Sequence, residues 1–287
     1  MKALTLNTRV GELAAHLYLP AGVTKPPVVI VTGAWTTVKE QMPATYAKAL
    51  AKEGYAALTF DFRGWGQSAS ELKYLENPHR KTDDIRAVIE AVAELEDVDG
   101  NRIAGLGICA SAGYMLDAAS GNSKVKAAAV VAPWLHDSAL VNAIYGGEES
   151  VKSLIEAGER AANADVPVYI EAASTTNSDS LMYQAPYYTE TDRGLIPEFD
   201  NKFNLASWKA WLTYDAQAGA KAQDKPVLMV ASQAMALPAG AQQYLDNAGV
   251  NVEVTWLDDV TQFDFYDVPQ HVAKATSLVA GHFDSKL

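Results

Sequence analysis

Hydrophobic residues along the chain gather in short runs, and stretches with helical spacing separate these runs. The run Pro26–Thr32 is almost wholly apolar, which is typical of a strand buried on both faces of a sheet. Further strands are expected at Ala56–Asp61, Arg102–Ile108, Lys126–Ala132, Pro226–Ala231 and Val252–Leu257, after two N-terminal strands at Ala3–Thr8 and Glu12–Tyr18.

Between the expected strands, apolar positions recur with the period of a helix. Ile85, Val88, Ile89 and Val92 show this spacing within a predicted helix from Pro78 to Glu96. Other helices are predicted at Ala44–Lys52, Ser111–Ala119 and Pro269–His282. Because strands and helices alternate, we predict an α/β fold with a mostly parallel central sheet flanked by helices.

The stretch 138–224 interrupts this alternation and is rich in large aromatic side chains. They are Tyr145, Tyr183, Tyr187, Tyr188, Phe199, Phe203, Trp208, Trp211 and Tyr214. An insertion of this size at the carboxyl ends of the strands predicts a helical lid over a core made of residues 1–137 and 225–287. The alternative is that these aromatics pack the insertion on itself, since aromatics dominate cores.

A strand runs directly into a helix through small residues at Gly105–Tyr114, and this turn is the sharpest chemical signal in the sequence. Small residues on either side of a nucleophile permit a tight, strained strand-to-helix turn. Cys109 is favoured at its apex over Ser111, because the strand ends at Ile108 and Ser111 falls within the first helical turn. The helix dipole there is expected to lower the pKa of the thiol. The alternative is a buried, inert cysteine.

With this turn, the chain resembles the α/β-hydrolase superfamily, and most closely its dienelactone-hydrolase-like branch, in which cysteine replaces the nucleophilic serine. The other markers are Val28–Gly33 leading to Lys39-Glu40-Gln41, the segment Phe60–Ser68, and Phe263–Asp267 before the last helix. The resemblance implies an oxyanion hole made by the backbone N–H of Ala110 and that of Ala34 or Trp35. Lys39 and Glu40 are expected to form a solvated ion pair.

Two positions depart from the family pattern, which needs an acid and then a histidine after the nucleophile. Met235 stands about where the acid is expected, and Gln262 stands where a histidine usually precedes the Phe263–Asp267 segment. Glutamine cannot accept and return a proton as imidazole does. The usual triad is therefore incomplete.

His136 is the histidine best placed to substitute, because it follows the strand next to the elbow strand. Asp137 beside it could orient the imidazole. The alternative is that the His-Asp pair is a turn or capping element. We therefore name Cys109 and His136 as catalytic candidates, and place Gln262, Trp134, Tyr114 and Met235 in the substrate pocket.

Composition narrows the range of partners. The chain has 23 Lys and Arg against 35 Asp and Glu, so the formal net charge is −12, which disfavours nucleic acid and anionic membranes. A single cysteine excludes an internal disulfide and a cysteine-based zinc site. No phosphate-binding loop, dinucleotide fingerprint or metal spacing occurs, so we expect no cofactor. The N-terminus lacks the features of a leader, and we expect a cytoplasmic protein that acts on a small neutral or apolar molecule; a homo-oligomer stays open.

Two functions are compatible with these residues. The first is an enzyme that acts on an ester, thioester or lactone through Cys109 with an atypical triad. The second is a non-hydrolytic member that uses the cavity for binding, isomerisation or cyclisation, and Gln262 and Met235 motivate it.

Overall fold

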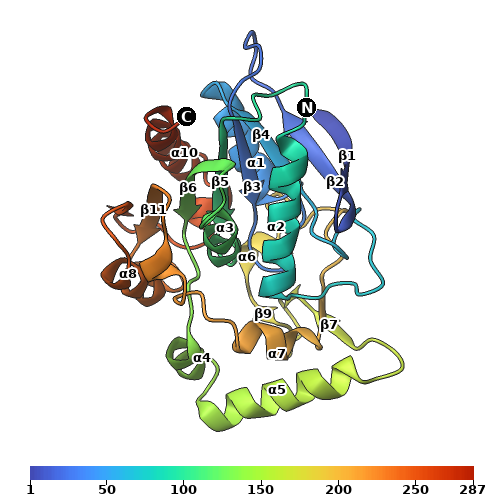
Figure 1. Cartoon of the computed structure of the whole chain (residues 1–287). Helices are drawn as coiled ribbons and strands as arrows, with labels where there is room; N and C mark the ends of the chain where they lie inside the picture. Colours follow the sequence, from blue (N-terminus) through green and yellow to red (C-terminus); the bar gives the residue numbers. More distant parts are fainter.

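An eight-stranded sheet forms the centre of the molecule (Figure 1). The computed structural model describes residues 1–287 and gives the strand order β1-β2-β4-β3-β5-β6-β11-β12. The strands are β1 (Lys2–Thr8), β2 (Gly11–Tyr18), β3 (Val28–Thr32), β4 (Ala56–Phe60), β5 (Ile103–Ile108), β6 (Val125–Val131), β11 (Val227–Ser232) and β12 (Val252–Leu257). Within this sheet only the pairs β1–β2 and β2–β4 are antiparallel, which confirms the mostly parallel central sheet.

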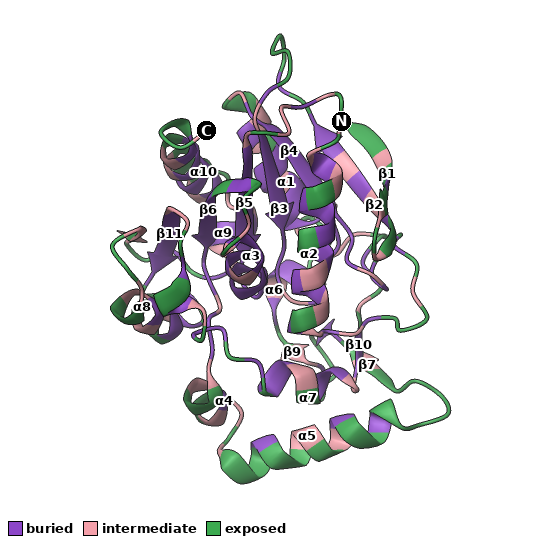
Figure 2. Cartoon of the chain, in the orientation of Figure 1, coloured by how far each residue is buried: buried purple, intermediate pink, exposed green.

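Helices cover the sheet and are placed by their apolar faces. They are α1 (Met42–Lys52), α2 (Pro78–Val92), α3 (Ser111–Ala119), α8 (Pro238–Asn247), the short α9 (Asp264–Asp267) and α10 (Pro269–Asp284). Helix α2 packs against α3, and α1 packs against α10. Every residue of β3, β4 and β5 is buried, as the purple centre of Figure 2 shows. Burial on both faces explains why these strands are apolar throughout.

The segment Phe60–Ser68 has a structural role, because its Asp61 makes buried polar contacts with the loop that carries Lys39. Asp61 accepts hydrogen bonds from the backbone N–H of Lys39 at 2.9 Å and from its ammonium group at 2.7 Å. Lys39 also forms the expected ion pair with Glu40, at 2.7 Å, but the side chain of Lys39 is only 1% exposed, so the pair is not the solvated one predicted. Gly66 has a φ of 47°, and a Cβ there would lie 2.4 Å from Asp61 Oδ2, which is why only glycine fits.

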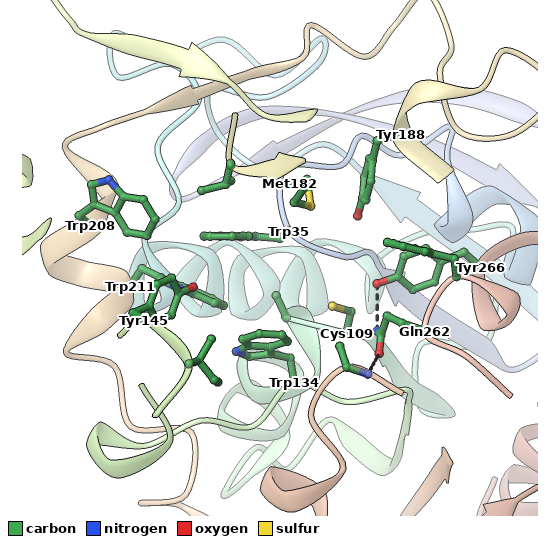
Figure 3. A pocket seen from close by; sticks show the side chains of 15 residues that line it. Trp35, Cys109, Trp134, Tyr145, Met182, Tyr188, Trp208, Trp211, Gln262 and Tyr266 are labelled. Carbon is green, nitrogen blue, oxygen red and sulfur yellow. Dashed lines mark hydrogen bonds between the residues drawn. The ribbon is translucent and has the colours of Figure 1, made fainter. Parts of the chain in front are cut away.

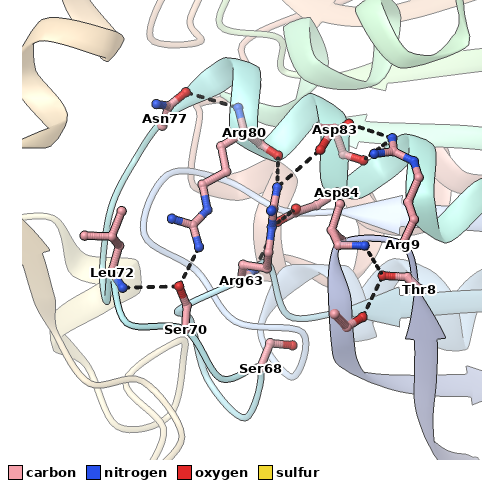
Figure 4. A network of polar contacts seen from close by, with 12 residues as sticks. Thr8, Arg9, Arg63, Ser68, Ser70, Leu72, Asn77, Arg80, Asp83 and Asp84 are labelled. Atoms are coloured by element: carbon pink, nitrogen blue, oxygen red, sulfur yellow. Dashed lines mark hydrogen bonds and ion pairs between the residues drawn. The ribbon is translucent and has the colours of Figure 1, made fainter.

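Arg63 in the same segment fixes helix α2 (Figure 4). Its backbone N–H and its guanidinium both donate to the buried carboxylate of Asp84, and the guanidinium also reaches the carbonyl of Arg80 at 3.3 Å. Asn77 caps the helix by accepting from the Arg80 N–H at 3.1 Å. The polar residues of the motif thus set the position of a helix that packs beneath the elbow.

Residues 138–224 form the insertion, which lies beyond the carboxyl ends of the parallel strands (Figure 1). It contains α4 (Ser138–Ile144), α5 (Glu148–Ala162), α6 (Pro186–Thr189), α7 (Ser207–Leu212), the 3-10 turn η1 (Ala220–Ala222), and the short strands β7 (Tyr169–Glu171), β8 (Ala173–Ser174), β9 (Met182–Tyr183) and β10 (Lys202–Asn204). Strands β7 and β10 pair antiparallel, and β8 and β9 pair parallel. The insertion is therefore a mixture of helices and small sheets, where a mainly helical or irregular lid was expected.

The helices do not include one that could cross a lipid bilayer, because none is both long and apolar enough.

Candidate active site

Cys109 lies at the apex of the turn between β5 and α3. Its φ of 57° is in the left-handed region, which is costly for any residue other than glycine and marks a strained position. A Cβ on Gly107 would lie 2.6 Å from the carbonyl oxygen of Ser111, so this close approach of strand and helix requires glycine. The hydroxyl of Ser111 is fully buried and bonds back to Ile108, so Ser111 is not the apex.

Three polar groups next to the thiol of Cys109 act to lower its pKa: the backbone N–H groups of Ala110 and Trp35 and the hydroxyl of Tyr266. The two amides are the pair that the resemblance implies for an oxyanion hole, with Trp35 as the second donor in preference to Ala34. Burial nevertheless raises the pKa of the Cys109 thiol, and these three groups offset only part of this effect. The expectation of a lowered pKa is wrong, because desolvation outweighs the neighbouring donors.

A buried carboxylate holds the loop that presents Trp35. Glu76 accepts from the backbone N–H of Thr36 at 3.4 Å, from the Lys81 ammonium at 2.8 Å and from the Tyr114 hydroxyl at 2.9 Å. The side chain of Tyr114 therefore points beneath the elbow and does not line the cavity, which corrects the expected pocket. Its role is to tie helix α3 to the same carboxylate that fixes the loop.

Gln262 lies beside Tyr266, where the family pattern calls for a histidine. Its amide nitrogen donates to the Tyr266 hydroxyl at 3.0 Å and to the carbonyl of Ala132 at 3.1 Å, and its amide oxygen accepts from the Ala236 N–H at 3.0 Å. These three bonds fix the side chain. Ala236 lines the cavity here, whereas Met235 is buried outside the cavity wall, which corrects the second pocket prediction.

His136 is fully buried, and both ring nitrogens are engaged away from the sulfur. Its Nδ1 accepts from Trp134 Nε1 at 2.8 Å, and its Nε2 donates to the carbonyl of Trp211 at 3.0 Å. Burial lowers the pKa of His136 to about 4, so the ring is neutral at ordinary pH. His136 does not line the cavity, and the structure does not bring it to Cys109 as a base. Asp137 caps α4 by accepting from the Leu140 N–H.

An apolar cavity of about 370 Å³ opens in front of the sulfur (Figure 3). The loops at the carboxyl ends of the strands contribute Trp35, Cys109, Trp134, Ala236, Gln262 and Tyr266. The insertion contributes Ile144, Tyr145, Met182, Tyr188, Trp208 and Trp211. Fourteen of the fifteen lining residues are hydrophobic. A cavity of this size and lining suits a small ligand with an apolar body.

Sequence reasoning placed none of the three cavity-wall tyrosines, Tyr145, Tyr188 and Tyr266, in the pocket. Tyr266 sits four residues after Gln262 in the segment Phe263–Asp267, and its hydroxyl accepts a hydrogen bond from Gln262 (Figure 3). The helical spacing of Gln262 and Tyr266 is the signal that could have found it. Tyr145 lies in the insertion, and the sequence held no local signal for its position.

Acidic, histidine and cysteine side chains do not gather in groups of three or more that could hold a metal ion.

Comparisons with known proteins agree with this geometry. Residues 13–182 match the model of the dienelactone hydrolase family. The uncharacterized protein YcjY of Escherichia coli is 31% identical over 96% of this chain and 95% of the relative. The structure of hypothetical protein PA2218 of Pseudomonas aeruginosa has a TM-score of 0.87 at 23% identity, covering 100% of this chain and 93% of the other. The α/β hydrolase GrgF of a Penicillium species has a TM-score of 0.83 at 18% identity, covering 99% of this chain and 98% of the other.

The family match extends from the second strand into the insertion, and it includes the elbow and the loop that carries Trp35. Structural likeness at these identities concerns the fold, which is that of the α/β hydrolases. The chain is a hydrolase-type enzyme and belongs to the dienelactone hydrolase family.

Proposed function

We propose that this protein acts on an ester, thioester or lactone with an apolar acyl group, and that the sulfur of Cys109 is the attacking atom. One observation carries the proposal: the sulfur lies at a strained elbow and faces an apolar cavity, with the backbone N–H groups of Ala110 and Trp35 next to it. Two convergent amides at this position can stabilise the oxygen of a tetrahedral intermediate.

The first chemical step forms a bond between the sulfur and the substrate carbonyl carbon. Tyr266 is the side chain that contacts the sulfur, and we assign it the proton transfer. In one relay, the Tyr266 oxygen accepts the thiol proton while its own proton passes to the leaving oxygen or sulfur of the substrate. The tetrahedral intermediate then collapses, which re-forms the carbonyl and expels that group as a neutral alcohol or thiol. Tyr266 begins and ends neutral, which suits a phenol whose pKa burial raises well above its ordinary value.

The second step, attack of water on the acylated sulfur, has no imidazole to assist it. Gln262 is held by Ala236, Ala132 and Tyr266, and an amide does not take up a proton from water. General-base assistance usually contributes a factor of about 10² to 10⁴. We therefore expect rapid acylation followed by slow release.

A burst experiment with p-nitrophenyl esters tests this function. Because Cys109 is the only cysteine, intact-mass spectrometry assigns any thiol adduct without ambiguity. We expect a stoichiometric burst of nitrophenol and an added acyl mass in the native protein, and neither in Cys109→Ala. Ser111→Ala is the matched control, because Ser111 is the alternative apex, and it should keep the adduct. Equal turnover by Cys109→Ala would overturn the proposal.

A second candidate function is binding or rearrangement of an apolar ligand without hydrolysis. The specific observation in its favour is that neither an imidazole nor a carboxylate lines the cavity. A native protein that binds esters but shows neither burst nor adduct would select this alternative.

A further inference from the structure

Four aromatic residues of the cavity region are linked by three hydrogen bonds, one of which ends on a backbone carbonyl. Trp134 Nε1 donates to His136 Nδ1 at 2.8 Å, and His136 Nε2 donates to the backbone carbonyl of Trp211 at 3.0 Å. Trp211 Nε1 then donates to the hydroxyl oxygen of Tyr145 at 2.8 Å. An indole N–H can only donate, so the bond from Trp134 fixes the proton of the imidazole on Nε2.

This series of hydrogen bonds ends on a donor that has no protein partner. The Tyr145 oxygen accepts from Trp211, and the Tyr145 hydroxyl donates to no protein acceptor. Burial raises the pKa of Tyr145, so the hydroxyl keeps its proton. Tyr145 lines the cavity, and its ring packs edge-on against Trp208 at a centroid distance of 5.8 Å. A fixed ring with an unused proton is a ready hydrogen-bond donor toward a ligand.

The position of this donor is distinct from that of the sulfur. In Figure 3, Tyr145 and Trp211 lie together on one side of Trp134, and Cys109 and Gln262 lie on the other. The cavity thus has polar groups at two ends: the sulfur, amides and Tyr266 at one, and the Tyr145 hydroxyl at the other. Indole and other hydrophobic side chains occupy the walls between them.

We propose that Tyr145 determines specificity by binding a neutral acceptor oxygen, such as a ketone or ether, at the end of the acyl group remote from the carbonyl that Cys109 attacks. His136 is a positioning residue that fixes Trp134 and Trp211, and through Trp211 it orients Tyr145. This inference rests on the proposed function. The acceptor is neutral because the walls offer no cation to a carboxylate, and burying an unpaired charge among hydrocarbon is costly.

A series of p-nitrophenyl keto-esters tests the proposal, with the keto group moved outward one carbon at a time and the unsubstituted ester of equal length as reference. We expect one keto position to raise kcat/KM about fivefold to tenfold, as one added neutral hydrogen bond would. Tyr145→Phe should bring this ratio to about one. Tyr183→Phe is the matched control, because Tyr183 is exposed and outside the cavity lining, and it should keep the ratio.

Binding separates this proposal from the proposed chemistry. The corresponding methyl esters are titrated calorimetrically into Cys109→Ala, which cannot be acylated at sulfur. A keto preference in binding with no burst in the native protein would support the Tyr145 site and refute the chemistry. Absence of a preference at every keto position, or a preference that Tyr145→Phe retains, would overturn the Tyr145 proposal.

The role of His136 has its own readout. His136→Gln carries an amide that can still donate toward the Trp211 carbonyl, whereas His136→Leu cannot. We expect His136→Gln to keep more of the keto preference than His136→Leu, with the difference in KM and not in kcat. An unchanged keto preference in His136→Leu would overturn the positioning role.

Discussion

The elbow at β5–α3 and the two loops after β11 and β12 lie side by side at one end of the cavity, but they differ in what they supply. At the elbow, Cys109 adopts a positive φ and has two backbone N–H groups next to its thiol, which we propose hold a substrate carbonyl oxygen. In the loops after β11 and β12, Gln262 bonds to Ala236 and Tyr266 and supplies an amide network in place of an imidazole and an acid. In the proposed mechanism, holding a carbonyl and moving a proton are therefore separate tasks of these two regions.

The largest expected effect comes from Cys109→Ser, which tests whether the elbow works without a base. A serine hydroxyl has a far higher pKa than a thiol, and the loops after β11 and β12 bring no imidazole to the cavity to remove its proton. We expect the acylation rate, measured as the nitrophenol burst, to fall by about a thousandfold or more. Comparable acylation rates in Cys109→Ser and the native protein would show that a base removes the serine proton, and this would contradict the prediction.

A second prediction restores the histidine of the family pattern in the loop after β12. Gln262→His would put an imidazole next to Tyr266 and the sulfur, and we expect steady-state hydrolysis to rise by about a hundredfold, with an inflection in its pH profile near the ordinary histidine pKa. Gln262→Leu is the control and should show no gain. If the histidine variant turns over no faster than the native protein, water attack is not the slow step.

The smallest effect concerns His136, which lies between the two regions but faces neither the sulfur nor Gln262. Its pKa is about 4 in the folded protein against 6.5 unfolded, so its contribution to stability is present above pH 6.5 and is lost as the pH falls through 4. At pH 4.5 the native protein should have lost about 2 kcal/mol more than His136→Gln, relative to each protein at pH 7.

Urea unfolding at the two pH values measures this difference. Equal losses in the native protein and His136→Gln would show that His136 is not buried as a neutral ring. The burst rate of the native protein should show no inflection near pH 6.5, because His136 is not linked to the sulfur.

The sequence predicted the fold well because the central strands are buried on both faces. The strand at Val252–Leu257 and the helix at Ser111–Ala119 have the boundaries expected from the apolar pattern. The burial of Lys39 was not predictable from the apolar pattern. Its charge indicates a solvated position, but its ammonium group pairs with the Asp61 carboxylate and its side chain is 1% exposed. Only the folded chain brings a partner 22 residues away to the ammonium group.

The site was predictable in part for the same reason. Cys109, Ala110, Trp35 and Gln262 follow strand ends, whose place in a parallel sheet is fixed by the fold. The direction of the His136 ring depends on Trp211, which lies 75 residues further along in the insertion. A contact of that kind leaves no local pattern in the chain.

Four of the six tryptophans, Trp35, Trp134, Trp208 and Trp211, surround the cavity in front of the sulfur. Because indole emission responds to local polarity and to quenching by a neighbouring group, we expect the intrinsic fluorescence of this protein to change when a ligand enters the cavity. The molecule consequently carries its own optical sensor of occupancy, which would let a library of unlabelled compounds be screened on the native chain.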